Sequence, residues 1–241
     1  MKTLLALTAA LVVISSLASQ GQTVTWSLGG SAGYASSNGN TLSFTQSGVK
    51  VTASAWGYTK GSGNTAFESG KLGQWDPQGL GVVNRDEKSE SPWHQVDNYT
   101  ENDYILFVFD KLVDVTSIKV TPSPSGYDTD ASYWVGKISS SNLADKTYTG
   151  LTGLASLGFS AEQIAYGTTP SSGGSANIAI DAPSSGINAI LIGAQRIGSA
   201  NFDKNTDAFK IGMITATVVP EPSAALLTVI GALGFCLRRR R

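Results

Sequence analysis

Short runs in the middle of the chain alternate apolar and polar side chains, and clusters of Gly, Ser, Thr and Asn separate these runs. Val24, Trp26 and Leu28 share one face of such a run, whereas residues 104–109 are apolar at almost every position. Alternation indicates a strand with one buried face, and a continuous apolar run indicates a central strand covered on both faces. The pattern predicts an all-β body.

About ten runs fit strands, and regularly spaced turn clusters between them are typical of a β-sandwich or jelly roll. The expected strands are residues 23–28, 41–46, 49–56, 80–83, 104–109, 113–120, 132–138, 176–182, 187–192 and 209–218. Ser47-Gly48 predicts a tight hairpin turn, and Asp110-Lys111 predicts a turn between two further strands.

Two local features refine this prediction. The alternation shifts by one position between Val115 and Ile118, which indicates a β-bulge. Residues 151–166 have the only helix-like spacing of apolar positions, and Gly153 and Gly158 limit any helix there to short pieces. The body is therefore expected to consist almost wholly of strands and loops.

Residues 1–20 differ in composition from this body. They hold Lys2, an apolar stretch from Leu4 to Ile14, and small residues at Ser16 and Ala18. A positive start, a short apolar core and small residues before a cleavage point are typical of a secretory signal peptide. We expect an N-terminal signal helix that signal peptidase removes, and an exported domain over residues 21–218.

Residues 219–241 combine three parts. The parts are Pro220, Glu221 and Pro222, then an apolar run from Ala224 to Leu237, then Arg238, Arg239, Arg240 and Arg241. As a helix the apolar run would be roughly 21 Å long, so it needs tilt or local thinning to cross a bilayer core of about 30 Å. Arginines stay on the cytoplasmic side, so the segment predicts a transmembrane helix with the body outside.

This segment closely resembles the PEP-CTERM sorting signal of Gram-negative bacteria, in which a Pro-Glu-Pro motif, a short apolar helix and an arginine cluster occur in this order. The resemblance implies that exosortase, a membrane-embedded transpeptidase-like enzyme, recognises residues 220–222 and that the arginines act as the membrane stop. It also implies release of the body to the cell surface or an extracellular matrix, after transient residence in the inner membrane. An ordinary C-terminal tail anchor is the alternative.

The middle of the body carries a second resemblance. Gly79-Leu80-Gly81-Val82, Val96-Asp97-Asn98 and the apolar run at 103–110 are similar to segments of exosortase-dependent surface proteins. The resemblance implies a β-sandwich surface domain and assigns no activity to it.

Composition narrows the classes of function. Without its two ends the body keeps 12 basic and 17 acidic residues, a formal charge near −5, so no basic face is left to bind nucleic acid. The single cysteine, Cys236, lies in the C-terminal segment. Disulfides and cysteine–metal sites are therefore excluded from the exported body.

Candidate catalytic residues form no recognisable motif. His94 is the single histidine, and the sequence has no Gly-x-Ser-x-Gly elbow, so nothing points to a Ser/His/Asp site. Acidic loop residues could supply the carboxylate pair of a glycoside hydrolase or lyase, although solvated loop charges are the simpler interpretation. These acids are Asp86, Glu87, Glu90 and Glu101. We expect no catalytic residues and a protein that is not an enzyme.

Asp128 and Asp130 lie in a Gly/Pro-rich loop and could supply oxygen ligands to Ca²⁺, as could Asp86, Asp97 and Asn98. Turn formation explains an Asp-x-Asp sequence equally well. We expect no cofactor, with structural Ca²⁺ as the open alternative.

Trp75 and Trp93 lie in or beside polar loops, where an aromatic face could stack on a pyranose ring. Anchoring of the loop to the core is the simpler role for both rings. Trp26 and Trp134 lie within expected strands, so core positions are expected for them.

The sequence thus predicts an exported surface or exopolysaccharide-matrix protein with a structural or adhesive role. The alternative is a carbohydrate-binding module, and a glycoside hydrolase or lyase comes third. The expected partners are signal peptidase, exosortase, the membrane before processing and an extracellular polysaccharide, without nucleic acid.

Overall fold

The computed structural model describes residues 21–61, 63–87, 94–99, 101–122, 127–167, 174–199 and 201–220. The chain divides into two units, residues 23–218 and a unit made of residues 1–22 and 219–241. The expected signal helix, Glu221, Pro222, the C-terminal apolar run and the arginine cluster lie outside the described residues, and so does Trp93. Within the described ranges no helix has the length and hydropathy needed to cross a membrane.

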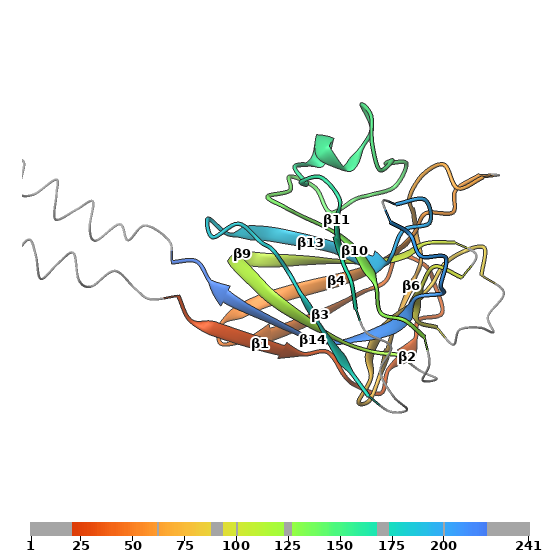
Figure 1. The fold of residues 1–241 in the computed structure, drawn as a ribbon. Coiled ribbons are helices and arrows are strands. Elements are labelled where there is room, and N and C mark those ends of the chain that lie inside the picture. The colour runs from red at the N-terminus through yellow and green to blue at the C-terminus, as the bar shows by residue number, and fades with distance from the viewer. Residues whose placement is uncertain are drawn as a thin grey trace, which may run out of the picture. The chain divides into compact units, whose positions relative to one another are not determined.

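Strands make up nearly all the regular structure of the unit at residues 23–218, as expected of an all-β body (Figure 1). They are β1 (Thr23–Ser27), β2 (Gly33–Tyr34), β3 (Thr41–Gln46), β4 (Val49–Gly57), β5 (Glu68–Ser69), β6 (Lys71–Trp75), β7 (Gly79–Val83), β8 (Val96–Asp97), β9 (Asp103–Thr121), β10 (Ala131–Gly136), β11 (Gln163–Ala165), β12 (Ala176–Ala179), β13 (Ile187–Ala194) and β14 (Ala208–Val218). One 3₁₀ helix, η1 (Leu154–Leu157), is present among the described residues.

The long strand β9 joins the two halves of the sheet. Its first half, residues 103–109, pairs with β4 and β13, and its second half, residues 113–121, pairs with β14 and β12. β3 continues the first half beyond β4, β10 and β11 continue it beyond β13, and β1 pairs with β14 in the second half. The described strands thereby form one antiparallel sheet of 14 strands.

The predicted turn at Asp110-Lys111 is wrong, because β9 runs through both residues. Near these two residues the register between β9 and β13 shifts, because Ile187 pairs with Val113 whereas Ala189 pairs with Val108. On the other side, the carboxylate Oδ1 of Asp110 accepts the Lys50 N–H at 2.9 Å. Asp110 therefore closes the ladder between β4 and β9, although turn-forming residues usually end a strand.

The predicted bulge in the second half of β9 is confirmed. Thr215 pairs with Ser117 and Ala216 pairs with Val115, which leaves Thr116 as the extra, exposed residue. Because a bulge inserts one residue, it restores the alternation that the sequence breaks. Val115 and Ile118 can therefore both face the core.

The structure has 14 strands where about ten were expected. β9 replaces two expected strands, which lowers the number by one, and the five short strands β2, β5, β6, β8 and β11, which were not expected, raise it by five. None of the five exceeds five residues, so none contains enough alternation to be recognised. In the region 151–166, Gly158 ends η1 in the left-handed conformation with a φ of 104°.

The main core contains side chains from both halves of β9 and from the strands paired with them. Trp26 of β1 packs its ring 5.5 Å from that of Phe109 in β9, and its indole Nε1 donates to the Val49 carbonyl at 3.1 Å. Apolar side chains from β1, β4, β9, β10, β12, β13 and β14 belong to this one cluster. Removal of this apolar surface from water is the main stabilising contribution to the fold.

A second, smaller core covers the opposite face of the first half of β9. Tyr104 and Leu106 point into it, whereas Ile105 and Phe107 point into the main core. The segment between β10 and β11, which includes η1, closes it with Leu143, Leu154 and Phe159; Figure 1 shows this segment in green beside β10 and β13. The prediction that residues 104–109 are covered on both faces is therefore confirmed.

We expect Phe107→Ala to lower the free energy of unfolding by about 3–5 kcal/mol, because it removes a fully buried ring and leaves a cavity. Lys111→Ala alters an exposed side chain of the same strand and should change stability by less than about 0.5 kcal/mol. Urea unfolding followed by circular dichroism measures both variants. Equal losses would contradict the central position of β9.

Candidate functional site

A stack of aromatic rings forms where the second core meets solvent. Tyr148 lies face to face with Tyr58, with ring centroids 3.9 Å apart, and with Trp134 at 5.7 Å. Its hydroxyl is 2.8 Å from that of Tyr104, which is fully buried. Tyr58 extends from the end of β4 and Trp134 lies within β10, so two strands and one loop build the stack.

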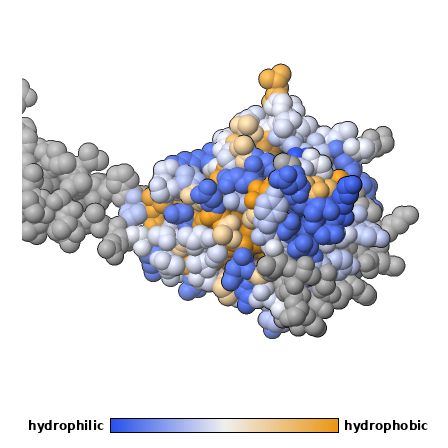
Figure 2. Space-filling model, viewed as in Figure 1, coloured by the Kyte–Doolittle hydropathy of each residue, from blue (hydrophilic) through white to orange (hydrophobic). Residues whose placement is uncertain are grey.

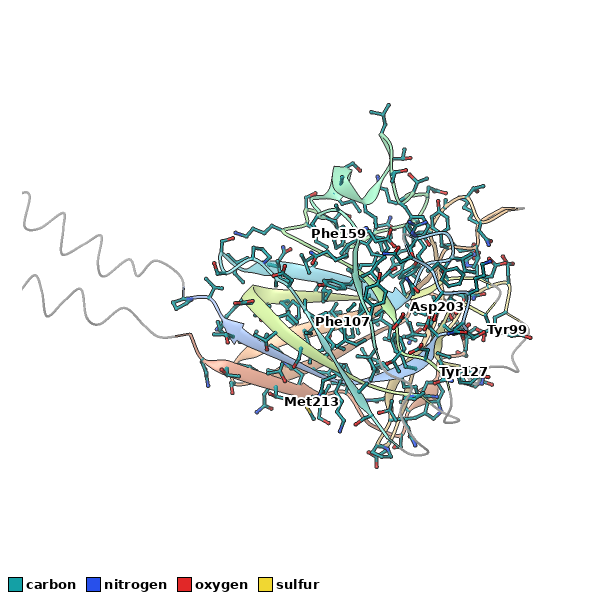
Figure 3. The ribbon with its side chains drawn as sticks, in the orientation of Figure 1. Tyr99, Phe107, Tyr127, Phe159, Asp203 and Met213 are labelled. Atoms are coloured by element: carbon teal, nitrogen blue, oxygen red, sulfur yellow. The ribbon has the colours of Figure 1, made fainter. Side chains whose placement is uncertain are left out.

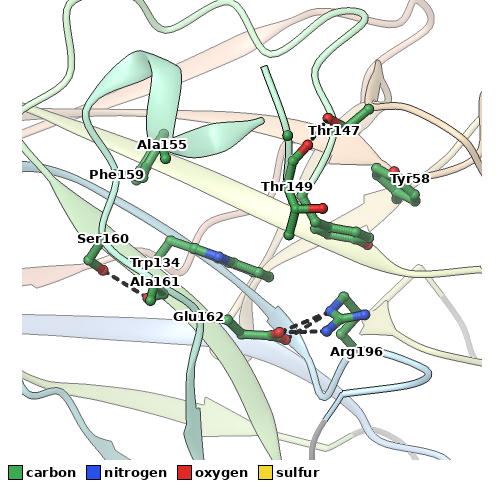
Figure 4. A pocket seen from close by; sticks show the side chains of 12 residues that line it. Tyr58, Trp134, Thr147, Thr149, Ala155, Phe159, Ser160, Ala161, Glu162 and Arg196 are labelled. Atoms are coloured by element: carbon green, nitrogen blue, oxygen red, sulfur yellow. Dashed lines mark hydrogen bonds and ion pairs between the residues drawn. The ribbon is translucent and has the colours of Figure 1, made fainter. Parts of the chain in front are cut away.

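A cavity of about 510 Å³ opens over this stack (Figure 4). The residues around it come from the end of β4, from β10, from the segment between β10 and β11 and from the loop after β13. They are Tyr58, Trp134, Thr147, Tyr148, Thr149, Gly150, Ala155, Phe159, Ser160, Ala161, Glu162 and Arg196. Aromatic rings thus form part of the wall, and hydroxyl and charged groups form the rest.

An ion pair between Arg196 and Glu162 lies at one side of the cavity (Figure 4). The guanidinium donates from Nε to Oε1 at 3.0 Å and from Nη2 to Oε2 at 2.6 Å. Ser132 holds both partners, because its hydroxyl donates to Glu162 at 2.8 Å and accepts the Arg196 N–H at 2.9 Å. Hydrogen bonding to Glu162 raises the pKa of Arg196 above its usual range.

Arg196 also lies over the ring of Tyr148, with its guanidinium carbon 4.9 Å from the centroid. A cation over an aromatic face is attracted by the ring quadrupole, so this contact helps to fix both side chains. The cavity therefore combines a rigid aromatic surface with a bidentate ion pair. Such a surface can pack against the C–H face of a sugar while the ion pair and threonines hydrogen-bond its hydroxyls.

The structure does not bring the expected sugar-binding residue Trp75 to this cavity. Trp75 is half-buried in β6, with the His94 ring parallel to it at 5.9 Å and the Lys210 ammonium 4.9 Å from its centroid. Its ring is therefore partly covered by the protein itself. Trp26 and Trp134 are buried, as expected.

Sequence reasoning missed Tyr148, Glu162 and Arg196 as a set. They lie up to 48 positions apart in segments expected to be loops or helical pieces, so no local pattern connects them. One signal was present in the composition, because Arg196 and Arg85 are the only arginines of the body. A rare arginine in an acidic domain often has a specific carboxylate partner.

The calcium candidates Asp128 and Asp130 do lie together, and Asp207 joins them from the start of β14. Carboxylate oxygens of the three residues come within 4.8 Å of one another. Asp207 is fully buried and accepts the Asn98 amide at 2.8 Å and the Asp130 N–H at 3.2 Å. Oxygen ligands at this separation suit Ca²⁺, and the sequence missed Asp207 because it lies 77 residues from Asp130.

The other acidic candidates do not join this cluster. Asp97 and Asn98 are adjacent, but Asn98 turns to Asp207 whereas the Oδ1 of Asp97 accepts the Tyr99 N–H at 3.0 Å. Glu87 is held by Asn84, whose Oδ1 accepts the Glu87 N–H at 2.8 Å. Glu90 lies outside the described residues. His94 is half-buried, and burial followed by the charge of Lys210 lowers its pKa.

Hydrophilic side chains gather at one end of the visible face (Figure 2). Asp203 and Tyr99 are labelled at this end in Figure 3, and the Tyr99 N–H donates to Oδ1 of Asp97 at 3.0 Å. The aromatic cavity and the acidic end are thus two distinct candidate sites. No family model, curated protein or solved structure matches the chain.

The buried carboxyls make the stability of the fold depend on pH. Burial, together with nearby Asp130, raises the pKa of Asp207 to about 8, and burial raises the pKa of Asp97 to about 7. In the unfolded chain an aspartate pKa is about 3.9. Each folded carboxyl keeps a proton that the unfolded chain releases, so its contribution to stability is lost as the pH rises from about 4 to about 8.

We therefore expect the free energy of unfolding in EDTA to fall by about 2 kcal/mol or more between pH 6.5 and pH 8. His94 has the opposite effect below this window, and Lys210, whose pKa burial lowers to about 8, has the opposite effect above it. Urea unfolding across the window measures the slope. Asp97→Asn should flatten it and Asp181→Asn, at an exposed position, should not. Rising stability would contradict the assignment.

Proposed function

We propose that this chain is an exported protein that exosortase sorts to the cell surface or the exopolysaccharide matrix, where it has a structural or adhesive role. The support is the order of segments in the sequence, from signal peptide to all-β body to the Pro220-Glu221-Pro222 segment. β14 ends at Val218 and Pro220 is exposed, so the motif begins directly after the last strand. Processing at residues 220–222 would therefore take place close to the folded body or before the final strand docks.

We infer further that the body is a β-sandwich of the kind found in surface domains. β9 contributes to both halves of the sheet, and the main core contains side chains from β1 and β4. Two packed halves with alternating inward residues are the arrangement that a sandwich requires. The jelly-roll alternative shares this core and differs in the order of the strands.

Carbohydrate binding is the function that the cavity at Tyr148 favours, and it would supply the adhesive role. The stacked rings of Tyr58, Tyr148 and Trp134 are held by their own contacts, so little side-chain freedom is lost when a ligand binds. A cavity of about 510 Å³ is in the usual size range of small-ligand sites, which fits one or a few sugar units. The ligand would be a segment of extracellular polysaccharide.

A glycoside hydrolase or lyase is less favoured by this cavity. Hydrolysis needs two carboxyl groups on either side of the scissile bond. Among the described residues that line the cavity, Glu162 is the only acid, and both of its oxygens accept hydrogen bonds from Arg196. We therefore propose a binding role without catalysis.

Sorting is tested by the intact mass of the mature protein from wild-type and exosortase-deficient cells. In the wild type we expect a body that lacks residues 1–20 and the segment beyond the 220–222 motif. In the deficient strain the C-terminal segment should remain, as it should for Glu221→Ala in wild-type cells. Chains that still end at Arg241 in both strains would contradict exosortase processing.

Glycan binding is tested by tryptophan fluorescence, with a neutral β-glucan, a galactomannan and alginate as probes. Tyr148→Ala should weaken binding at least tenfold, because it removes the central ring of the stack, and Arg196→Lys should weaken it too, because lysine lacks the bidentate fork. Tyr99→Ala, at a tyrosine that is 61% exposed and does not line the cavity, is the matched control.

Three results would contradict a carbohydrate site at this cavity. The first is no response to any probe, and the second is unchanged affinity in Tyr148→Ala and Arg196→Lys. The third is loss of binding in Trp75→Ala or Trp93→Ala alone, which would place the site at those residues. Unfolding curves of each variant show whether a loss of binding reflects a loss of the fold.

A further inference from the structure

Three carboxylates near the start of β9 each leave one oxygen without a partner. Asp103 accepts the Asn84 amide through Oδ1 at 2.9 Å, and Glu87 accepts the Asn84 N–H through Oε2 at 3.3 Å. The remaining oxygens, Asp103 Oδ2, Glu87 Oε1 and Asp97 Oδ2, are buried and have no hydrogen-bond partner. Each side chain thus has one fixed oxygen and one that is available.

Burial of these unpaired oxygens lowers the stability of the fold when the carboxylates are ionised. Asp103 is 0% exposed and Asp97 is 5% exposed. An ionised carboxylate away from water needs a compensating charge. The ion pairs found among the described residues are elsewhere, at Lys60–Asp145, Arg85–Glu68 and Arg196–Glu162. None of the ion pairs found in the described ranges neutralises the three carboxylates, and protons or a bound cation could do so.

The three groups influence one another. Burial raises the pKa of Asp103 well above its usual range, and the charges of Asp97 and Glu87 raise it further. Glu101 acts on Asp103 in the same direction. Repulsion between like charges in a buried site is the electrostatic setting that a divalent cation relieves.

A cavity lies beside this cluster, and of the three carboxylates Glu87 lines it. The cavity has a volume of about 340 Å³, and Asn84, Glu87 and His94 lie in its wall. Asp103 is linked to this wall through the amide of Asn84. Arg85 also lines the cavity, but its guanidinium donates to the Ser69 carbonyl and hydroxyl, both at 3.0 Å.

We propose that Glu87, Asp97 and Asp103 form a binding site for Ca²⁺, which enters through the cavity beside Asn84. All three free ligand atoms are carboxylate oxygens, which hard cations prefer, and Ca²⁺ tolerates irregular geometry better than Mg²⁺ does. The ligand oxygens of Asp128, Asp130 and Asp207 lie within 4.8 Å of one another, whereas those of Glu87, Asp97 and Asp103 do not, so the ion would have to draw these three carboxylates together. Glu87 has the longest side chain of the three and lies in a loop, so it moves to complete the site.

The proposed ion would fasten the loop after β7 and the strand β8 to the start of β9. This site is distinct from the Asp128, Asp130 and Asp207 cluster, and from the cavity at Tyr148. It does not depend on the proposed sorting or on carbohydrate binding.

Calorimetric titration of the full-length chain with CaCl₂ at pH 8, after treatment with EDTA, tests the proposal. We expect saturable binding, a rise in the unfolding temperature on adding Ca²⁺, and release of protons on binding. Asp97→Asn and Asp103→Asn should each weaken Ca²⁺ binding at least tenfold. Each replaces a ligand oxygen by an amide of the same shape, so the fold is preserved, and unfolding curves check this.

Asp203→Asn, at an exposed acid outside both carboxylate clusters, is the matched control and should retain Ca²⁺ binding. Asp128→Asn tests the neighbouring cluster separately. Loss of binding in Asp128→Asn with retention in Asp97→Asn and Asp103→Asn would overturn the proposal and place the ion at Asp128, Asp130 and Asp207. Absence of any response to CaCl₂ would also overturn it, and would show that protons neutralise the three carboxylates. Tighter binding of MgCl₂ than of CaCl₂ would overturn the choice of cation.

Discussion

The burial of both faces of the first half of β9 is the constraint on which the rest of the structure depends. Ile105 and Phe107 fill the main core while Tyr104 and Leu106 fill the second core, so one strand supports two apolar clusters. Its second half then turns the sheet back toward β1 and β14. Because the strand is shared, the position of the aromatic cavity is coupled to the packing of the main core. A substitution that shifts β9 in one core would therefore also shift the side chains that β9 contributes to the other core.

The strands that could be predicted are those whose own residues carry the signal. β3 is found at its expected bounds, and the bulge at Thr116 follows from the shifted alternation of Val115 and Ile118. The continuity of β9 through Asp110-Lys111 could not be predicted, because turn-forming residues usually end a strand. The hydrogen bond from the Lys50 N–H to the Asp110 carboxylate, which accompanies this continuity, joins residues 60 positions apart. β5 and β8 have two residues each, so they contain no alternating pattern and are defined only by their pairing with neighbouring strands.

The candidate sites show the same division more strongly. Asp128 and Asp130 were recognised because they are two positions apart, whereas Asp207 became their neighbour only through folding. The aromatic stack needs Tyr58, Trp134 and Tyr148 from three separate segments. A site whose residues come from distant segments produces no recognisable motif in any short stretch of sequence. The residue types indicated which class of ligand to expect. Only the fold showed which individual residues lie together.

The pairing of β1 with β14 has a mechanical consequence. Thr23 lies opposite Thr217, so the first and last strands of the body are antiparallel neighbours, and β14 is bonded to β9 on its other side. Tension applied at Val218 along β14 would load the hydrogen bonds of both ladders at once, in shear, since these bonds run perpendicular to the strands. A strand held in this way resists extraction far better than one whose bonds open one at a time. The body would therefore withstand pulling from its C-terminal end.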